Sequence, residues 1–183
     1  MKDEPALEHL LEHRYASLVG YATLVSGSRQ DAEDLVHDAV VSVFSKKRRF
    51  DSFDHAYSYV LRAIASRHVD ARRSWLRRVS REDRAAALAP RFAPGPEESV
   101  GMDDAVVAAL ATLSPRERAC VVMRHLADQS VADTAHALGI SDGAVKRYTS
   151  DGLAALVASG LMTQEVADAA AVEKVDVKIG GAR

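Results

Sequence analysis

The sequence is poor in the features that mark secreted and membrane proteins. Its single cysteine, Cys120, cannot form an internal disulfide, and its place in the apolar run ACVVM predicts a buried structural thiol. No apolar run approaches the roughly 18 residues that a membrane span requires. The first residues, MKDEPALEHLLEHRY, lack the basic front and uninterrupted apolar core of a signal peptide. We therefore expect a soluble, cytoplasmic protein.

Two further absences concern fold and charge. No segment alternates apolar and polar residues as a strand does, whereas apolar residues recur at steps of three and four. The net charge is only −2, so the chain as a whole has no excess of positive charge with which to attract phosphate. The charges are nevertheless segregated along the sequence. Hydrophobic residues make up 48% of the chain, which excludes a disordered protein.

The helical segments predict an all-α fold of two small helical domains. Residues 80–104 interrupt the helical spacing with Pro90, Pro94, Gly95 and Pro96, and they carry six acidic residues against three arginines. This composition predicts a flexible acidic linker. The domains are then residues 1–79 and residues 105–158. Residues 159–183 are expected to form a flexible tail.

Three amphipathic helices are predicted in the first domain. The first covers about residues 5–25 and has its apolar stripe at Leu7, Leu10, Leu11, Tyr15, Leu18 and Ala22. The second lies in SRQDAEDLVHDAVVSVF, residues 28–44, and its acidic first turn favours the positive end of the helix dipole. The third covers about residues 56–78 and is otherwise basic, with its apolar stripe at Tyr57, Val60, Leu61, Ile64, His68, Ala71 and Trp75.

Residues 130–152, SVADTAHALGISDGAVKRYTSDG, have the pattern of a helix-turn-helix. Ser130 and Ser141 are predicted N-caps and Gly139 ends the first helix, as Ser114 caps an earlier one in SPRE. Ala135 lies four positions before the glycine, where the two helices must approach closely. Pairs of capped helices also occur in bundles that bind nothing, so this segment alone leaves both interpretations open.

The stretch HLLEH at residues 9–13 matches H-x-x-E-H, a zinc-protease pattern in which two histidines one helical turn apart hold the metal. Leu10 and Leu11 are needed for the apolar stripe, and the sequence offers no identifiable third ligand. We therefore predict no enzyme activity, no catalytic residue, no metal site and no cofactor.

The order of four segments gives the chain a family resemblance. An acidic-fronted helix, DAEDLVHDAVVSVF, is followed by a basic aromatic helix, YSYVLRAIASRHVDARR, by the acidic linker, and by LSPRERACVVMRHLADQSVADTAHALGISDGAVKR. Over about residues 5–158 this order resembles the extracytoplasmic-function (ECF) sigma factors of the bacterial sigma-70 family. The resemblance implies an alternative sigma factor that directs core RNA polymerase to specific promoters and helps to open them.

The resemblance also implies binding sites for the polymerase and for promoter DNA. The family's D-x-E-D-x-x-Q helix binds a coiled coil of the beta-prime subunit, and the beta subunit is a further implied partner. The polymerase-binding residues are then Asp31, Glu33, Asp34, His37 and Asp38, with histidine at the glutamine position. The melted −10 strand is implied to contact Phe50, Ser52, Phe53, Asp54, His55, Tyr59, Arg62, Ser66, Arg67, Arg72 and Arg73.

The helix-turn-helix corresponds to the part of the family that reads the −35 element in duplex DNA. The implied contacts are Arg116, Arg124, Ser141, Asp142, Gly143, Lys146, Arg147 and Ser150, and Arg118 is a further candidate for a phosphate contact. The chain departs from the family where Asp151 and Gly152 replace a basic, helix-favouring run. Tyr59 also stands where tryptophan is frequent.

Two other functions are compatible with the residues. A stand-alone helix-turn-helix regulator would dimerise and bind duplex DNA without polymerase, and a sigma-like interaction module would bind polymerase without reading promoters. Members of the family are often held inactive by an anti-sigma factor, so such a partner is implied as well. No residue of this chain identifies it.

Overall fold

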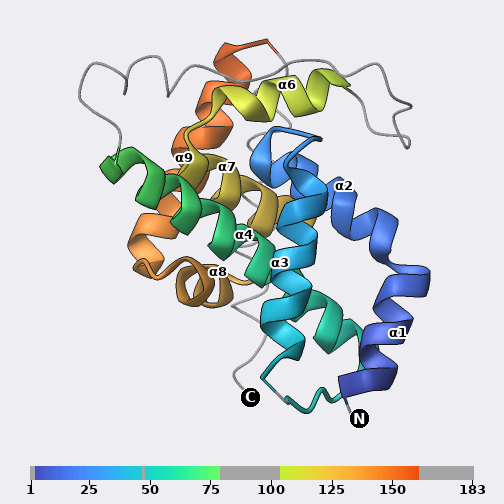
Figure 1. The fold of residues 1–183 in the computed structure, drawn as a ribbon. Helices are drawn as coiled ribbons and strands as arrows, with labels where there is room; N and C mark the ends of the chain where they lie inside the picture. The colour runs from blue at the N-terminus through green and yellow to red at the C-terminus, as the bar shows by residue number, and fades with distance from the viewer. Residues whose placement is uncertain (1–2, 47, 79–103, 161–183) are drawn as a thin grey trace.

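The computed structural model describes residues 3–46, 48–78 and 104–160, so the predicted linker, apart from Asp104, and most of the predicted tail lie outside the described residues. Within the described ranges every regular element is helical, which confirms the predicted all-α class (Figure 1). The first half of the chain contains α1 (Asp3–His13), α2 (Tyr15–Ser26), α3 (Ala32–Phe44) and α4 (Phe53–Arg78). The second half contains α6 (Asp104–Thr112), α7 (Pro115–Val121), the short π-helix η1 (Val122–Leu126), α8 (Val131–Leu138) and α9 (Asp142–Ala158).

The prediction of a single helix over residues 5–25 is wrong, because the structure has two helices that are separated at Arg14. The backbone there leaves helical geometry at φ −127° and ψ −2°, and α1 turns away from α2 to pack on α4 (Figure 1). Two members of the predicted stripe, Leu11 and Tyr15, are consequently 47% and 39% exposed. No glycine or proline lies at the break, and the apolar spacing continues across it, so nothing in the sequence signals that the helix is interrupted there.

Helix α3 packs against both α2 and α4, and its amphipathic pattern is confirmed. One face buries Ala32, Val36, Ala39 and Val43. Helix α4 buries Val60, Leu61 and Ile64 of its predicted stripe, whereas Ala71 is exposed and the other three members, Tyr57, His68 and Trp75, are half-buried. The stripe ends early because the last turns of this long helix extend past the helices that cover its middle.

The predicted caps of the second half are present. Ser114 and Glu117 form a reciprocal capping box with Pro115 at the first helical position. Ser130 and Ser141 each accept a backbone N–H bond at the start of α8 and α9, and Gly139 ends α8 in the left-handed conformation at φ 60°. These local signals place the two helices of the helix-turn-helix.

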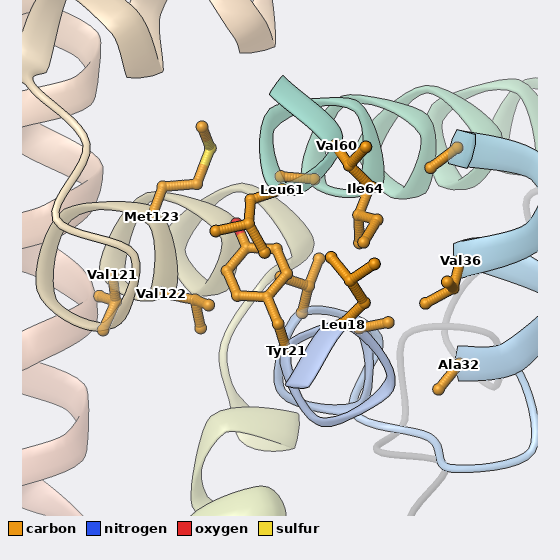
Figure 2. Close-up of a cluster of buried hydrophobic side chains, with 14 of the residues drawn as sticks. Leu18, Tyr21, Ala32, Val36, Val60, Leu61, Ile64, Val121, Val122 and Met123 are labelled. Atoms are coloured by element: carbon orange, nitrogen blue, oxygen red, sulfur yellow. The ribbon is translucent and has the colours of Figure 1, made fainter. Parts of the chain in front are cut away.

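The two halves of the chain pack together around one continuous core. Helices α2 and α4 of the first half contact α6, α7 and α8 of the second half. Figure 2 shows the ring of Tyr21 between Leu61 of α4 and Val122 of η1, with Met123 beside them. All four side chains are buried. The two predicted units therefore share apolar surface and are not separated in this structure.

Gly152 explains one departure of the sequence from the pattern of the family that it resembles. A Cβ atom at this position of α9 would lie 2.8 Å from Val121 Cγ2 of α7, so the glycine permits the close approach of the two helices. At Gly143, near the start of the same helix, an added Cβ would meet nothing within 4 Å. Glycine lowers the helix propensity at residue 152, but it is needed there for the close packing of α9 on α7.

These two glycines form a matched pair for a stability test. We expect Gly152→Ala to lower the free energy of unfolding by about 1–3 kcal/mol, because overpacking displaces α9 from α7. Gly143→Ala is expected to raise it by up to about 1 kcal/mol, because alanine loses less backbone entropy in a helix. Urea unfolding of the full chain measures both. Equal effects of the two substitutions would contradict the packing role of Gly152.

Candidate polymerase and nucleic-acid interfaces

The acidic face of α3 is solvent-exposed along its full predicted extent. The exposed residues are Asp31, Glu33, Asp34, His37 and Asp38. The opposite face of the helix is buried, so the carboxylates stand on a rigid support. None of the ion pairs between described residues uses these carboxylates. Such a row of uncompensated negative charge suits a basic partner helix.

The N-terminus of α4 presents polar and aromatic side chains. Ser52 accepts a hydrogen bond from the His55 backbone N–H at 3.0 Å, which caps the first turn. Ser52, Phe53 and Asp54 are exposed and His55 is half-buried. The Phe53 ring stacks on His9 of α1 with centroids 4.0 Å apart. One exposed aromatic face therefore combines residues from α1 and α4.

Tyr59 lies in a cluster of aromatic and cationic groups. Its ring makes edge contacts with Phe50 and His55, whose centroids lie 6.1 Å and 6.5 Å away. The guanidinium carbons of Arg48 and Arg62 lie 4.6 Å and 5.3 Å from its centroid, and Arg48 Nη1 donates a hydrogen bond to its hydroxyl. Cation–π contacts of this kind fix a ring within a positive environment. Arg48 was not among the predicted site residues, although its place in the run KKRR before Phe50 was a signal for it.

Phe50 corrects one predicted DNA contact. Its side chain is only 2% exposed and belongs to the core, where it packs against Phe44 at a centroid distance of 5.4 Å. A buried ring cannot stack on a base, so Phe50 supports the loop from inside. Tyr57 is half-buried and packs against the same core, as expected for a member of the apolar stripe of α4.

The remaining predicted −10 residues follow α4 toward its C-terminus. Ser66 and Arg67 are half-buried, whereas Arg73 is exposed. Arg72 lies over the Trp75 ring at 4.5 Å, so its position is set by a neighbour on the same helix. The basic surface of α4 is therefore only partly open to solvent.

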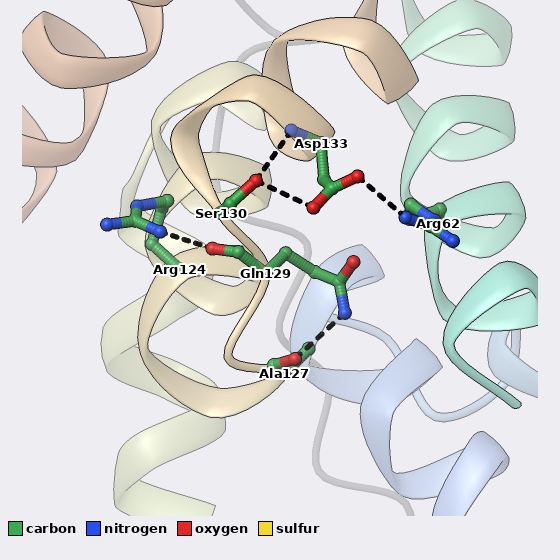
Figure 3. A network of polar contacts seen from close by, with 6 residues as sticks. All are labelled: Arg62, Arg124, Ala127, Gln129, Ser130 and Asp133. Carbon is green, nitrogen blue, oxygen red and sulfur yellow. Dashed lines mark hydrogen bonds and ion pairs between the residues drawn. The ribbon is translucent and has the colours of Figure 1, made fainter. Parts of the chain in front are cut away.

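Arg62 is engaged by the second half of the chain. Its Nη1 lies 2.9 Å from Oδ1 of Asp133 in α8, and the two side chains are 20% and 49% exposed (Figure 3). Ser130 holds the same carboxylate from the other side, because its hydroxyl donates to Asp133 Oδ2 at 2.6 Å. No pattern in the sequence pointed to a contact between Asp133 and Arg62.

The helix-turn-helix has its own small core. Cys120, Ala135 and Val145 are buried together, with Ile140 and Tyr148 packed against them. Burial raises the pKa of the Cys120 thiol to about 12, which agrees with the predicted structural thiol. The small side chain of Ala135 thus fulfils its predicted role at the crossing of α8 and α9.

The front of α9 presents its predicted residues to solvent. The exposed residues are Ser141, Asp142, Gly143, Lys146, Arg147 and Ser150. The Arg147 guanidinium lies over the Tyr148 ring at 5.0 Å. Arg116 donates to the Tyr148 hydroxyl at 3.4 Å, and this hydrogen bond lowers the pKa of that hydroxyl. Arg124 is half-buried and donates to the carbonyl of Gln129, so it ties the turn before α8 (Figure 3).

Arg118 corrects a second predicted contact, because it is buried between the halves of the chain. Its Nη1 donates to the Leu110 carbonyl at 3.4 Å, and its Nη2 lies 3.4 Å from His68 Nε2 of α4. Burial lowers the pKa of Arg118 to about 10 and that of His68 to about 4, with neighbouring arginines adding to both effects. Gly27, at φ +71°, leaves room for this guanidinium where any side chain would collide with it. Arg118 is therefore a packing residue of the interface.

The H-x-x-E-H pattern leads to an aromatic contact in the structure. The rings of His9 and His13 stack with centroids 4.7 Å apart. Among the described residues, no three or more His, Cys, Asp or Glu side chains are grouped so that they could hold a metal ion. In the same part of the chain, no helix has the length and apolar character needed to span a bilayer.

Comparison with known proteins gives matches in both halves of the chain. Residues 10–84 match the family described as Sigma-70 region 2, and residues 103–156 match the family described as Sigma-70, region 4. The chain is 31% identical over 146 residues to the ECF RNA polymerase sigma factor SigM of Mycobacterium tuberculosis, covering 79% of this chain and 71% of the relative. It is 27% identical over 150 residues to the RNA polymerase sigma-E factor of Streptomyces coelicolor, covering 81% and 82%.

A solved structure shares the fold. The sigma factor RpoE of Bartonella quintana, in complex with the anti-sigma factor NepR, matches with a TM-score of 0.57 and 21% identity, covering 82% of this chain and 92% of that chain. Helical architecture and sequence matches together define a bacterial transcription initiation factor of the sigma-70 type. The chain belongs to the ECF sigma factors of that family. It is an alternative sigma factor that directs RNA polymerase to promoters, and neither the stand-alone regulator nor the interaction module is favoured.

Proposed function

We propose that the three functions of this sigma factor lie on three separate surfaces. The acidic face of α3 binds the beta-prime coiled coil of core polymerase. Ser52 and the first turn of α4 at Phe53–His55, with Tyr59 and the basic face of the same helix, hold the melted −10 strand. The front of α9 reads the −35 element. The corresponding domains are residues 1–79 and residues 105–158, and the protein acts in the cytoplasm without enzymatic activity of its own.

The segregation of charge carries this proposal. Carboxylates occupy α3 without basic partners among the described residues, while arginines and aromatic rings gather on the neighbouring α4. Single-stranded DNA is held by stacking on aromatic rings within a positive groove. A basic polymerase helix would bind the acidic surface of α3, and a negatively charged nucleic acid would bind the basic surface of α4. The few basic residues on α9 are sufficient because the polymerase supplies most of the affinity for DNA.

Reconstituted transcription tests the proposal. The purified chain is mixed with bacterial core polymerase, the complex is isolated by size, and transcription is run on a pool of genomic fragments. We expect a stable complex and new, specific start sites that share two sequence elements. A complex that starts no transcript would reject the assigned DNA surfaces, and the absence of a complex would reject the α3 site.

We also propose that the chain has a protein partner of the anti-sigma class. The solved relative was crystallised with such a factor, and its similarity covers both halves of this chain. Purification of the tagged chain from its native cells, run alongside the reconstitution, checks for this partner. Recovery of polymerase subunits alone, with and without stress, would reject it.

A further inference from the structure

Tyr148 in α9 has no role in the three proposed surfaces, although it lies beside one of them. Its ring packs against the small core of the helix-turn-helix, formed by Cys120, Ala135 and Val145. Its hydroxyl makes a polar contact instead, because it accepts a hydrogen bond from Nη1 of Arg116 at 3.4 Å. A tyrosine with an anchored ring and a polar tip can hold another polar side chain in a fixed place.

Arg116 reaches this hydroxyl from a different helix. It lies in the first turn of α7, 32 positions before Tyr148, and α7 packs against α9 (Figure 1). The Arg147 guanidinium lies over the ring of the same tyrosine, with its central carbon 5.0 Å from the ring centroid. The hydrogen bond from Arg116 is the main cause that lowers the pKa of the Tyr148 hydroxyl, and Arg147 adds to it. One tyrosine therefore contacts a guanidinium group from each of the two helices.

Both arginines remain able to bind an anion. A guanidinium group has several N–H donors, and the hydrogen bond to Tyr148 occupies only one donor of Arg116. None of the ion pairs between described residues involves Arg116 or Arg147. Arg147 is exposed and Arg116 is half-buried. The remaining donors of the two side chains are thus available to anionic oxygens such as those of a DNA phosphate.

We propose that Tyr148 is a positioning residue of the −35 surface, which holds Arg116 beside Arg147 so that both contact the same stretch of DNA backbone. This inference rests on the assignment of the front of α9 to the −35 element. An arginine loses rotamer freedom when it binds a phosphate, and a side chain that is already held loses less. Tyr148 thus adds a basic residue of α7 to a helix whose own basic residues are Lys146 and Arg147.

A contact to the DNA backbone has two measurable properties. Each phosphate contact adds about 0.9 to the slope of log affinity against log salt. It carries no sequence information, so its loss weakens binding to an intact and to a scrambled −35 element by the same factor. The effect expected for Tyr148 therefore differs from that of Lys146 and Arg147, whose contacts to base edges would change the preference between the two elements.

Tyr148→Phe tests the proposal, because it removes the hydroxyl and keeps the ring in the small core. Binding of the reconstituted holoenzyme to a promoter from the genomic pool is measured over a range of salt, with the −35 element intact or scrambled. We expect the substitution to weaken binding to both about two- to tenfold and to lower the salt slope by about 0.9. Tyr15→Phe, at the exposed start of α2, is the control and should bind like the parent chain.

A double-substitution cycle tests whether the hydroxyl acts through Arg116. Arg116→Ala alone should lower the salt slope as much as Tyr148→Phe, and the two changes together should lower it no further than Arg116→Ala alone. Additive losses would show that the hydroxyl meets DNA by itself and would overturn the positioning role. Thermal unfolding of each variant measures stability. A lower midpoint for Tyr148→Phe with an unchanged salt slope would reduce the hydroxyl to a structural role and overturn the proposal.

Failure of this inference can be separated from failure of the −35 assignment. If Tyr148→Phe leaves the salt slope unchanged while Lys146→Ala with Arg147→Ala reduces the preference for the intact element, the assignment stands and the positioning role is wrong. If neither change alters promoter binding, the front of α9 does not read the −35 element, and the inference fails with that assignment. An equal fall in slope for Tyr15→Phe would also overturn it, because the effect would not be specific to α9.

Discussion

Replacing Asp34 with lysine is expected to weaken the binding of core polymerase by a factor of about 100 or more. Asp34 is exposed in the first turn of α3, among carboxylates that have no basic partner in the described chain. If these carboxylates meet a basic helix, the substitution replaces an attraction with a repulsion, and like charges placed together in an interface cost several kcal/mol. Titration of labelled core polymerase with the full-length chain measures the loss.

The control must separate interface charge from net charge and from stability. Glu8→Lys, at an exposed position of α1, changes the net charge by the same two units and should bind polymerase like the parent chain. Asp34→Lys also places a positive charge near the positive end of a helix dipole, which costs about 0.3–1 kcal/mol of stability. Thermal unfolding shows whether the chain remains folded. If both substitutions weaken polymerase binding equally, the assignment of α3 to the polymerase interface is wrong.

The sequence predicted best the features that depend on neighbours close along the chain. The capping box at Ser114 and Glu117, the N-caps at Ser130 and Ser141, and the left-handed Gly139 are all decided within a few residues. The crossing of α8 and α9 could be predicted equally well from the sequence, because it needs a small residue at Ala135 and an apolar Val145. Local backbone chemistry and the spacing of apolar residues carry this information.

Contacts between distant segments were not accessible in the same way. Arg62 and Asp133 are 71 positions apart, and each alone has the pattern of an ordinary surface charge. Arg118 lies beside a well-capped helix start and was predicted to face phosphate, yet the packing of the halves buries it against His68. Phe50 shows the same limit, because an aromatic residue in a basic loop can stack on a base or enter the core. Only the three-dimensional arrangement distinguishes these outcomes.

The second large effect is expected when Lys146 and Arg147 are both replaced with alanine. Both side chains are exposed on the front of α9, next to an N-terminus that Ser141 caps. An arginine or lysine contact to a guanine edge is worth about 1–3 kcal/mol of discrimination, and each phosphate contact adds about 0.9 to the slope of log affinity against log salt. We expect the double substitution to reduce preference for an intact over a scrambled −35 element about tenfold or more.

The pattern of losses distinguishes a reading surface from a structural one. Because the α3 face is separate from α9, the double alanine variant should bind core polymerase normally and should still open promoters that depend on the −10 element. Arg147 lies over Tyr148, so thermal unfolding is needed to show that loss of this contact leaves the helix-turn-helix intact. Transcription from paired promoters, repeated over a range of salt, measures selection and the salt slope together. A variant that retains full −35 preference would show that α9 meets DNA through other residues, and one that loses polymerase binding as well would show that its defect lies in folding.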